Sequence, residues 1–179
     1  MRVTGGRFRS RTLEGPPRGA RGTRPTTDRV REALFSALGA RMDLSGARVL
    51  DLFAGTGALG LEAISRGAAH AAFVEAHNPT LGIARRNARA LGVADLCSFV
   101  RGDALAHLAR PLAPPPDIVF ADPPYALERL PEIAPLALDA VASGGMVVLE
   151  HDDRHDFSEH PACVFSRDYG ATRLSLFEG

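Results

Sequence analysis

The sequence of 179 residues contains no lysine and only two cysteines. Cys97 and Cys163 lie far apart and lack the spacing of metal ligands, so neither a disulfide framework nor a cysteine metal site is expected. No run of about 18 apolar residues occurs, which argues against a bilayer-spanning helix. The first residues contain no hydrophobic segment typical of a secretory signal. These absences predict a cytoplasmic protein with no membrane partner.

The net charge of zero conceals an uneven distribution of charge along the chain. Residues 1–31 contain nine arginines against Glu14 and Asp28, a balance of +7, whereas residues 32–179 contain twelve arginines and nineteen acids, a balance of −7. Every cation is a guanidinium, which binds phosphate in a bidentate manner and stacks on bases. The basic start of the chain therefore favours a nucleic-acid partner, and a solvated basic tail is the alternative.

We predict a basic arm or hairpin over residues 1–24 and a folded catalytic domain over residues 25–179. In the segment Arg7–Leu13 the arginines alternate, so an extended strand would place three of them on one face, roughly 6.7 Å apart. Such a row could follow a phosphate backbone. The candidate nucleic-acid contacts are Arg7, Arg9, Arg11, Arg24 and Arg29.

A helix is predicted after the arm, because apolar residues recur at helical spacing from Val30 to Leu38. Thr26, Thr27 or Asp28 can cap its start, and Gly39 suits its end. Arg29 lies in the first turn, where the helix dipole disfavours a cation. This position is a mild indication that Arg29 serves a ligand.

Strands and helices alternate through the rest of the chain, which predicts a doubly wound, mostly parallel sheet of the α/β class. The expected strands are residues 48–53, 70–75, 98–100, 117–121 and 146–150. Helices are expected in between, including one that Asn78 caps. Residues 163–167 and 172–177 are expected to add an antiparallel hairpin at the edge, which gives seven strands.

A glycine loop follows the first strand. Gly55-Thr56-Gly57-Ala58-Leu59-Gly60 matches the dinucleotide-binding pattern, which makes NAD the first hypothesis. However, Asp51 precedes the loop by four residues and would repel a pyrophosphate. S-adenosylmethionine has no phosphate and carries an ammonium and a sulfonium, so acids would attract it. Asp51, Glu75 and Asp103 are expected along the edge where such sheets bind ligands.

A second motif, Asp122-Pro123-Pro124-Tyr125, follows the strand at residues 117–121. Proline restricts the backbone and removes N–H donors, so this loop offers a carboxylate and carbonyls as acceptors. That arrangement suits an exocyclic amine, which donates both hydrogens while its lone pair faces an electrophile. The Tyr125 ring offers a surface on which a base can stack.

Together these motifs resemble the Rossmann-like, class I S-adenosylmethionine-dependent methyltransferases that modify exocyclic amines. The flanking segments Gly5-Gly6, Arg24-Pro25-Thr26, residues 28–35 and Tyr169-Gly170-Ala171-Thr172 resemble the RsmD family of bacterial 16S ribosomal RNA guanine-N2 methyltransferases. The resemblance covers nearly the whole chain. It implies an enzyme that acts on ribosomal RNA, and the short arm fits docking onto an assembling small subunit. We expect a monomer with no metal.

The resemblance also implies roles for individual residues. It implies that the methionine part of the cofactor contacts Asp51, Phe53, Ala54, Gly55, Thr56 and Gly57. It implies that Glu75 binds the ribose hydroxyls and that Asp103 with the Ala104 backbone binds the adenine. The target guanine would be held by Asp122, Pro123, Pro124 and Tyr125.

Other interpretations stay open at this point. An adenine-N6 or cytosine-N4 methyltransferase of DNA uses the same kind of loop, and the residues alone do not distinguish guanine N2 from adenine N6. A non-catalytic RNA-binding module is a further alternative, although intact acids in both motifs argue against it. An NAD oxidoreductase ranks last. The histidines and acids of residues 151–160 lack a compact metal-ligand pattern and are expected to form a solvated loop.

Overall fold

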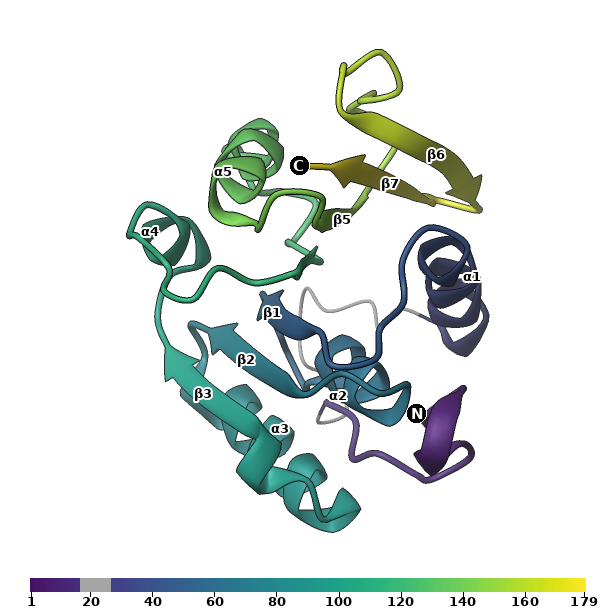
Figure 1. Cartoon of the computed structure of the whole chain (residues 1–179), viewed down its shortest axis with the longest axis vertical. Coiled ribbons are helices and arrows are strands. Elements are labelled where there is room, and N and C mark those ends of the chain that lie inside the picture. Colours follow the sequence, from purple (N-terminus) through teal and green to yellow (C-terminus); the bar gives the residue numbers. More distant parts are fainter. Residues whose placement is uncertain (17–26) are drawn as a thin grey trace.

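The computed structural model describes residues 1–16 and 27–179. Within them, seven strands form one sheet in the order β3-β2-β1-β4-β5-β7-β6, and β7 runs antiparallel to both of its neighbours (Figure 1). The strands are β1 (Arg48–Leu52), β2 (His70–Glu75), β3 (Cys97–Arg101), β4 (Ile118–Ala121), β5 (Met146–His151), β6 (Cys163–Tyr169) and β7 (Thr172–Glu178). The predicted mostly parallel sheet with its C-terminal antiparallel hairpin is confirmed.

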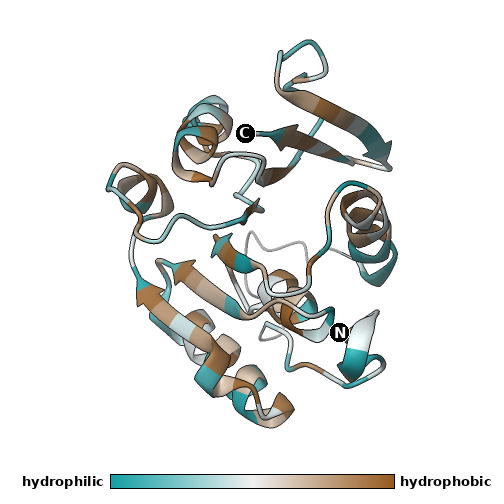
Figure 2. Cartoon of the chain, in the orientation of Figure 1, coloured by the Kyte–Doolittle hydropathy of each residue, from teal (hydrophilic) through white to brown (hydrophobic). Residues whose placement is uncertain are grey.

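Helices cover both faces of the sheet. The described helices are α1 (Asp28–Gly39), α2 (Ala58–Ser65), α3 (Asn78–Leu91), α4 (Ala104–Leu108) and α5 (Ile133–Ala140), with short 3-10 helices η1 (Gly6–Phe8), η2 (Ala94–Leu96) and η3 (Leu130–Glu132). Apolar residues of α1, α2 and α3 form one core cluster with the sheet, and those of α4 and α5 form a second on its other face. Figure 2 shows hydrophobic residues gathered on the central strands between these layers.

The C-terminal ends of the central parallel strands lie at one edge of the sheet. Strands β4 and β5 are buried along their whole length, as expected for parallel strands covered on both faces. The register pairs Leu52 with Val74 and Ala121, and pairs Ala121 with Leu149. The loops that follow β1, β2 and β4 therefore leave the sheet at the same edge, which we call the carboxyl edge.

The predicted strand over Arg7–Leu13 is wrong. Gly6 and Ser10 have positive φ angles of 72° and 69°, and the chain turns through η1, which begins at Gly6. Residues 1–3 and 10–13 then pair around an antiparallel bridge between Arg2 and Thr12, with three main-chain hydrogen bonds between the two segments. Contacts with α2 add to this pairing: Glu62 accepts hydrogen bonds from the Thr4 and Gly5 main-chain N–H groups at 2.7 Å each. These contacts hold residues 1–13, which we call the closed loop, against α2.

The described part of the basic arm, residues 1–16, packs against the core of the protein. Val3 and Leu13 are 1% and 2% exposed and belong to the core cluster on the α1–α3 face. The domain boundary predicted at residue 24 and the candidate contact Arg24 lie outside the described residues. Figure 1 shows the N-terminus beside α2, although the two are far apart in the sequence.

Two helix ends differ from the sequence prediction. Thr27 caps α1 by accepting a hydrogen bond from the Val30 N–H, as the sequence allowed, but the helix runs through Gly39 to a cap at Ala40. His77, and not Asn78, precedes α3, because Asn78 is already its first residue.

Candidate active site

Asp51 lies at the centre of the carboxyl edge and is 2% exposed. Its carboxylate accepts a hydrogen bond of 2.9 Å from the Gly60 N–H, in the first turn of α2. Burial raises the pKa of Asp51 well above its usual value, and the negative charges of Asp122 and Glu75 raise it further, whereas the Gly60 bond opposes the shift. The structure thus brings three of the predicted acids within electrostatic reach of one another.

The glycine loop between β1 and α2 bends sharply. Phe53, Gly55 and Gly57 all have positive φ angles, of 55°, 54° and 81°. Phe53 is not a glycine, so this conformation costs on the order of 1–3 kcal/mol, and such strain concentrates at functional sites. A side chain at Gly60 would place its Cβ 2.4 Å from the Phe73 ring, so only glycine lets α2 approach the sheet this closely.

Glu75 and Asp103 end or follow neighbouring strands. Glu75 accepts hydrogen bonds from the Gly55 N–H at 3.0 Å and from the His77 N–H at 2.7 Å, which fixes its carboxylate beside the glycine loop. Asp103 follows β3 and caps α4 through the Ala106 N–H at 2.8 Å. Its side chain is exposed, whereas Ala104 is buried. Asp103 therefore stands at the outer end of the row of acids.

The sequence interpretation missed Asn87, which supports the glycine loop from α3. Asn87 is 2% exposed, and its amide donates to the Thr56 carbonyl at 3.0 Å and to the Glu14 carbonyl at 3.1 Å. Its own oxygen accepts from the Glu14 N–H at 2.7 Å. One side chain thus links the glycine loop with the described part of the basic arm. The available signal was a polar residue on the apolar face of α3.

The second motif leaves β4 at the same edge. Pro123 is buried, Pro124 is exposed and Tyr125 is half-buried. The Tyr125 hydroxyl and Thr172 Oγ1 are 2.7 Å apart and share a hydrogen bond. Burial raises the pKa of Tyr125 to about 12, so the phenol stays neutral at physiological pH. Asp122 and Glu150 add to this rise, which places both acids near the tyrosine.

The predicted nucleic-acid contacts lie away from this edge. Arg7, Arg9 and Arg11 are exposed on the closed loop, which is bound at the C-terminal end of α2, whereas the glycine loop is at the N-terminal end of that helix. The eight residues of α2 correspond to about 12 Å. Arg29 is exposed in the first turn of α1. The structure does not bring these arginines together with the acids.

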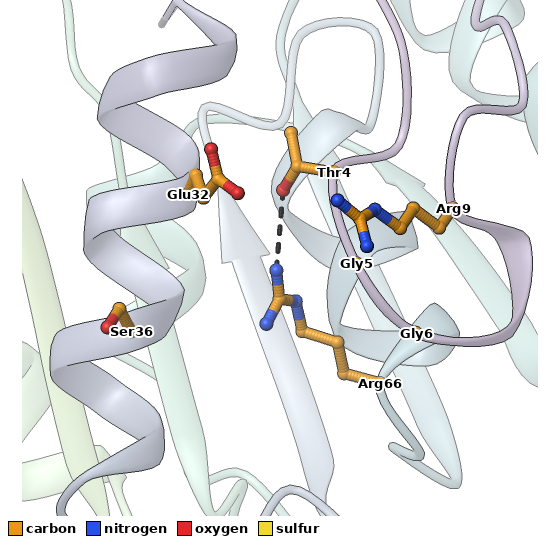
Figure 3. A pocket seen from close by; sticks show the side chains of 7 residues that line it. All are labelled: Thr4, Gly5, Gly6, Arg9, Glu32, Ser36 and Arg66. Atoms are coloured by element: carbon orange, nitrogen blue, oxygen red, sulfur yellow. Dashed lines mark hydrogen bonds between the residues drawn. The ribbon is translucent and has the colours of Figure 1, made fainter.

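A hollow of about 380 Å³ lies between α1 and the closed loop (Figure 3). It is lined by Thr4, Gly5, Gly6, Arg9, Glu32, Ser36 and Arg66. The Arg66 guanidinium reaches up to Thr4 Oγ1 at 3.3 Å, and Glu32 and Ser36 come from α1 (Figure 3). Among the described residues, Arg9 is the only predicted site residue that lines this hollow. The hollow is therefore distinct from the carboxyl edge.

Two further features bear on the class of protein. Across residues 1–16 and 27–179, no group of three or more histidine, cysteine or acidic residues is arranged to hold a metal ion. None of the helices in the described ranges is both long and apolar enough to cross a membrane.

The carboxyl edge fits S-adenosylmethionine better than a dinucleotide. A pyrophosphate would need the N–H groups of the first turn of α2, but the buried carboxylate of Asp51 already accepts from Gly60 there. A cation beside Asp51 would instead relieve the repulsion among Asp51, Glu75 and Asp122. The residue set thus matches a cofactor with a cationic amino acid end.

Comparison with known proteins supports the same conclusion. The family model described as "Conserved hypothetical protein 95" matches residues 1–178. Ribosomal RNA small subunit methyltransferase D of Escherichia coli is 37% identical over 164 residues, which cover 90% of this chain and 80% of that protein.

Solved structures share the fold. The structure of the Escherichia coli protein yhhF, proposed to be a methyltransferase, is 34% identical and superposes with a TM-score of 0.84 over 99% of this chain and 97% of that one. An RNA methyltransferase from Salinibacter ruber, solved with S-adenosyl-L-homocysteine, is 20% identical and has the same fold, with a TM-score of 0.65 over 86% of this chain and 92% of that one. This chain therefore belongs to the family of conserved hypothetical protein 95, the RsmD family of S-adenosylmethionine-dependent methyltransferases.

Proposed function

We propose that this enzyme methylates the exocyclic N2 amine of a guanine in 16S ribosomal RNA, within the assembling small subunit. The observation that carries the proposal is the placement of the Asp122–Tyr125 motif beside Asp51 and Glu75 at the carboxyl edge. Family membership supports ribosomal RNA as the substrate class. We further propose that the enzyme works as a monomer in the cytoplasm, where ribosomes are assembled.

The target amine is held by the residues that follow β4. The Asp122 carboxylate and the Pro123 carbonyl accept the two amine hydrogens, which leaves the nitrogen lone pair free to face the methyl group of the cofactor. The base leaves its stack, as in other base-modifying enzymes, and lies against the half-buried Tyr125 ring. These contacts accelerate transfer chiefly by orientation. The Asp122 charge also stabilises the positive charge that develops on the amine.

The cofactor residues have separate tasks. Asp51 and the main chain from Phe53 to Gly57 hold the amino acid end, Glu75 the ribose hydroxyls, and Asp103 with Ala104 the adenine. When bound, the cofactor supplies an electrophilic methyl group on a sulfonium. Glu75 is already oriented by two main-chain N–H groups, so its carboxylate needs little reorganisation on binding. No strong base is required, because the methylated cation is itself acidic.

The proposal is tested by transfer of labelled methyl groups to unmethylated small subunits, with naked ribosomal RNA and duplex DNA in parallel. Nucleoside analysis then identifies the product. We expect N2-methylguanosine, mainly on the subunit. Label on adenine or cytosine of DNA would favour the alternative methyltransferase class. Cofactor binding without transfer to any of these substrates would contradict the proposed function.

Replacing Asp51 with asparagine should stabilise the free protein and weaken cofactor binding. Burial raises the pKa of Asp51. The contribution of this residue to the free energy of unfolding is therefore fully present below its ordinary pKa of 3.8 and is lost as the pH rises through the pKa of the folded state. Asparagine keeps an acceptor for Gly60 and removes this loss. Thermal unfolding at pH 5 to 8 should show a smaller pH dependence in the variant.

Cofactor binding to the wild type should release protons. Asp51 has a raised pKa in the free protein, and a cationic ligand favours its ionised form. Calorimetry in buffers of different ionisation enthalpy measures this release, and Asp51→Asn should reduce it. Asp95→Asn, at an exposed position in η2, is the matched control. An unchanged proton release in Asp51→Asn would argue against Asp51 as the group that titrates.

Arg7, Arg9 and Arg11 are proposed to contact RNA phosphates, and their replacement should lower the salt dependence of RNA binding. Loss of three phosphate contacts lowers the slope of log K against log salt by about 2 for single-stranded RNA. A triple alanine variant is compared with one at Arg48, Arg110 and Arg167, which are also exposed. Equal slopes in the two variants would contradict a specific role for the closed loop.

A further inference from the structure

Two elements outside the second motif hold Tyr125, and the sequence motifs do not explain either contact. Thr172 is the first residue of β7, directly after the tight turn that joins it to β6. Its hydroxyl shares the 2.7 Å hydrogen bond with the Tyr125 hydroxyl, although the two residues are 47 positions apart. Arg154, from the loop after β5, donates to the Tyr125 carbonyl. The ring end and the main-chain end of Tyr125 are therefore held separately.

The Arg154 contact is itself connected to β7 through a chain of hydrogen bonds. Arg154 Nε donates to the Asp152 carboxylate at 2.6 Å. The Asp152 carbonyl accepts from His151 Nδ1 at 2.8 Å, and His151 Nε2 is 2.9 Å from Ser175 Oγ on β7. His151 is fully buried, and burial lowers its pKa, so the ring stays neutral with its proton on Nδ1. The support for Tyr125 is thus continuous with the sheet.

We infer that Thr172 and Arg154 are positioning residues that hold the Tyr125 ring in the orientation that receives the target base. This inference rests on the proposed function, because it concerns the base that Tyr125 stacks on. A phenol ring on an exposed loop rotates about its side-chain bonds, and ordering it on binding costs free energy. The Thr172 hydrogen bond orders the ring in the free enzyme, so less conformational entropy is lost when the substrate binds. The C-terminal hairpin therefore contributes to the reaction although it carries no residue of the glycine loop or of the Asp122–Tyr125 motif.

The position of the contact determines which kinetic constant should change. RNA affinity comes mostly from phosphate contacts, and the Thr172 hydroxyl is already engaged by Tyr125. The orientation of the amine depends on the Asp122–Tyr125 loop, of which Tyr125 is the last residue. Loss of the Thr172 hydroxyl should therefore lower kcat by about three- to tenfold, the value of one hydrogen bond. The KM for RNA and the Kd for the cofactor should stay close to those of the wild type.

Thr172→Val removes the hydroxyl and keeps the shape, and Thr172→Ser keeps the hydroxyl. We expect the kcat loss in Thr172→Val and its recovery in Thr172→Ser. In a Tyr125→Phe background Thr172→Val should have no further effect, because the bond is already absent. Ser98→Ala removes a hydroxyl of β3 that shares a 3.2 Å hydrogen bond with His70 and is not linked to the support of Tyr125, and it serves as the control.

A second measurement needs no substrate. The sequence contains two tyrosines and no tryptophan, so in a Tyr169→Phe background Tyr125 alone supplies the fluorescence. Thr172→Val should add a fast local component to the decay of its fluorescence anisotropy, and Thr172→Ser should not. An unchanged decay in Thr172→Val, or equal kcat losses in Thr172→Val and Ser98→Ala, would overturn the inference. Absence of RNA methylation by the wild type would instead refute the proposed function, so the two failures are distinguishable.

Discussion

Replacing Asp122 with alanine should lower kcat for methyl transfer by about 10²- to 10³-fold, the size of effect typical of one preorganised electrostatic contact. The reason is that, in the proposed mechanism, the carboxylate accepts an amine hydrogen and carries the charge that balances the developing cation. Cofactor binding should change little, because the cofactor contacts that we propose are made by Asp51 and Glu75 on neighbouring strands. Single-turnover transfer and calorimetric titration of the cofactor measure the two properties separately.

Two further variants sharpen this experiment. Asp122→Asn keeps one acceptor oxygen but loses the charge, so its kcat should lie between those of the wild type and Asp122→Ala. Asp139→Ala removes an exposed acid of α5 and serves as the control. A loss of cofactor binding in Asp122→Ala, with a normal rate per bound complex, would assign Asp122 to the cofactor and not to the amine.

The sheet and the two motif loops could be predicted from the sequence because their signals are local. Strands such as β4 and β5 are short apolar runs, and the glycine loop and the proline loop are contiguous in the chain. The order of these elements then places both loops at one edge, because parallel strands end at the same side. The acids Asp51, Glu75 and Asp122 follow from that rule without knowledge of any contact.

The supporting contacts could not be predicted, because each joins residues that are distant in the sequence. The alternation of Arg7, Arg9 and Arg11 indicates a strand, but main-chain bonds close this segment into a loop, and Glu62, more than fifty positions away, binds the preceding N–H groups and attaches the loop to α2. The Thr172 bond to Tyr125 likewise depends on where the hairpin joins the sheet. Local pattern defines the reacting groups, and long-range packing defines how rigidly they are held.

Replacing Glu62 with alanine should have the largest effect on stability. Glu62 is fully buried and accepts from Thr4 Oγ1 at 2.8 Å and from Arg66 Nε at 2.9 Å, besides the main-chain donors of Thr4 and Gly5. The fully buried Arg31 places its Nε 3.5 Å from the same carboxylate. Removing one partner of such a network costs about 3–5 kcal/mol, because the remaining polar groups stay buried.

Denaturant unfolding measures this loss, and Glu32→Ala, at an exposed position on α1, should stay within about 0.5 kcal/mol of the wild type. Glu62→Gln keeps an acceptor oxygen and should fall between the two. A loss below about 1 kcal/mol in Glu62→Ala would mean that the closed loop is not fixed by this carboxylate. If the variant still folds, its RNA affinity should decrease more than its cofactor affinity. The reason is that Glu62 orders the loop that carries Arg7, Arg9 and Arg11, whereas the acids of the carboxyl edge are held by the sheet.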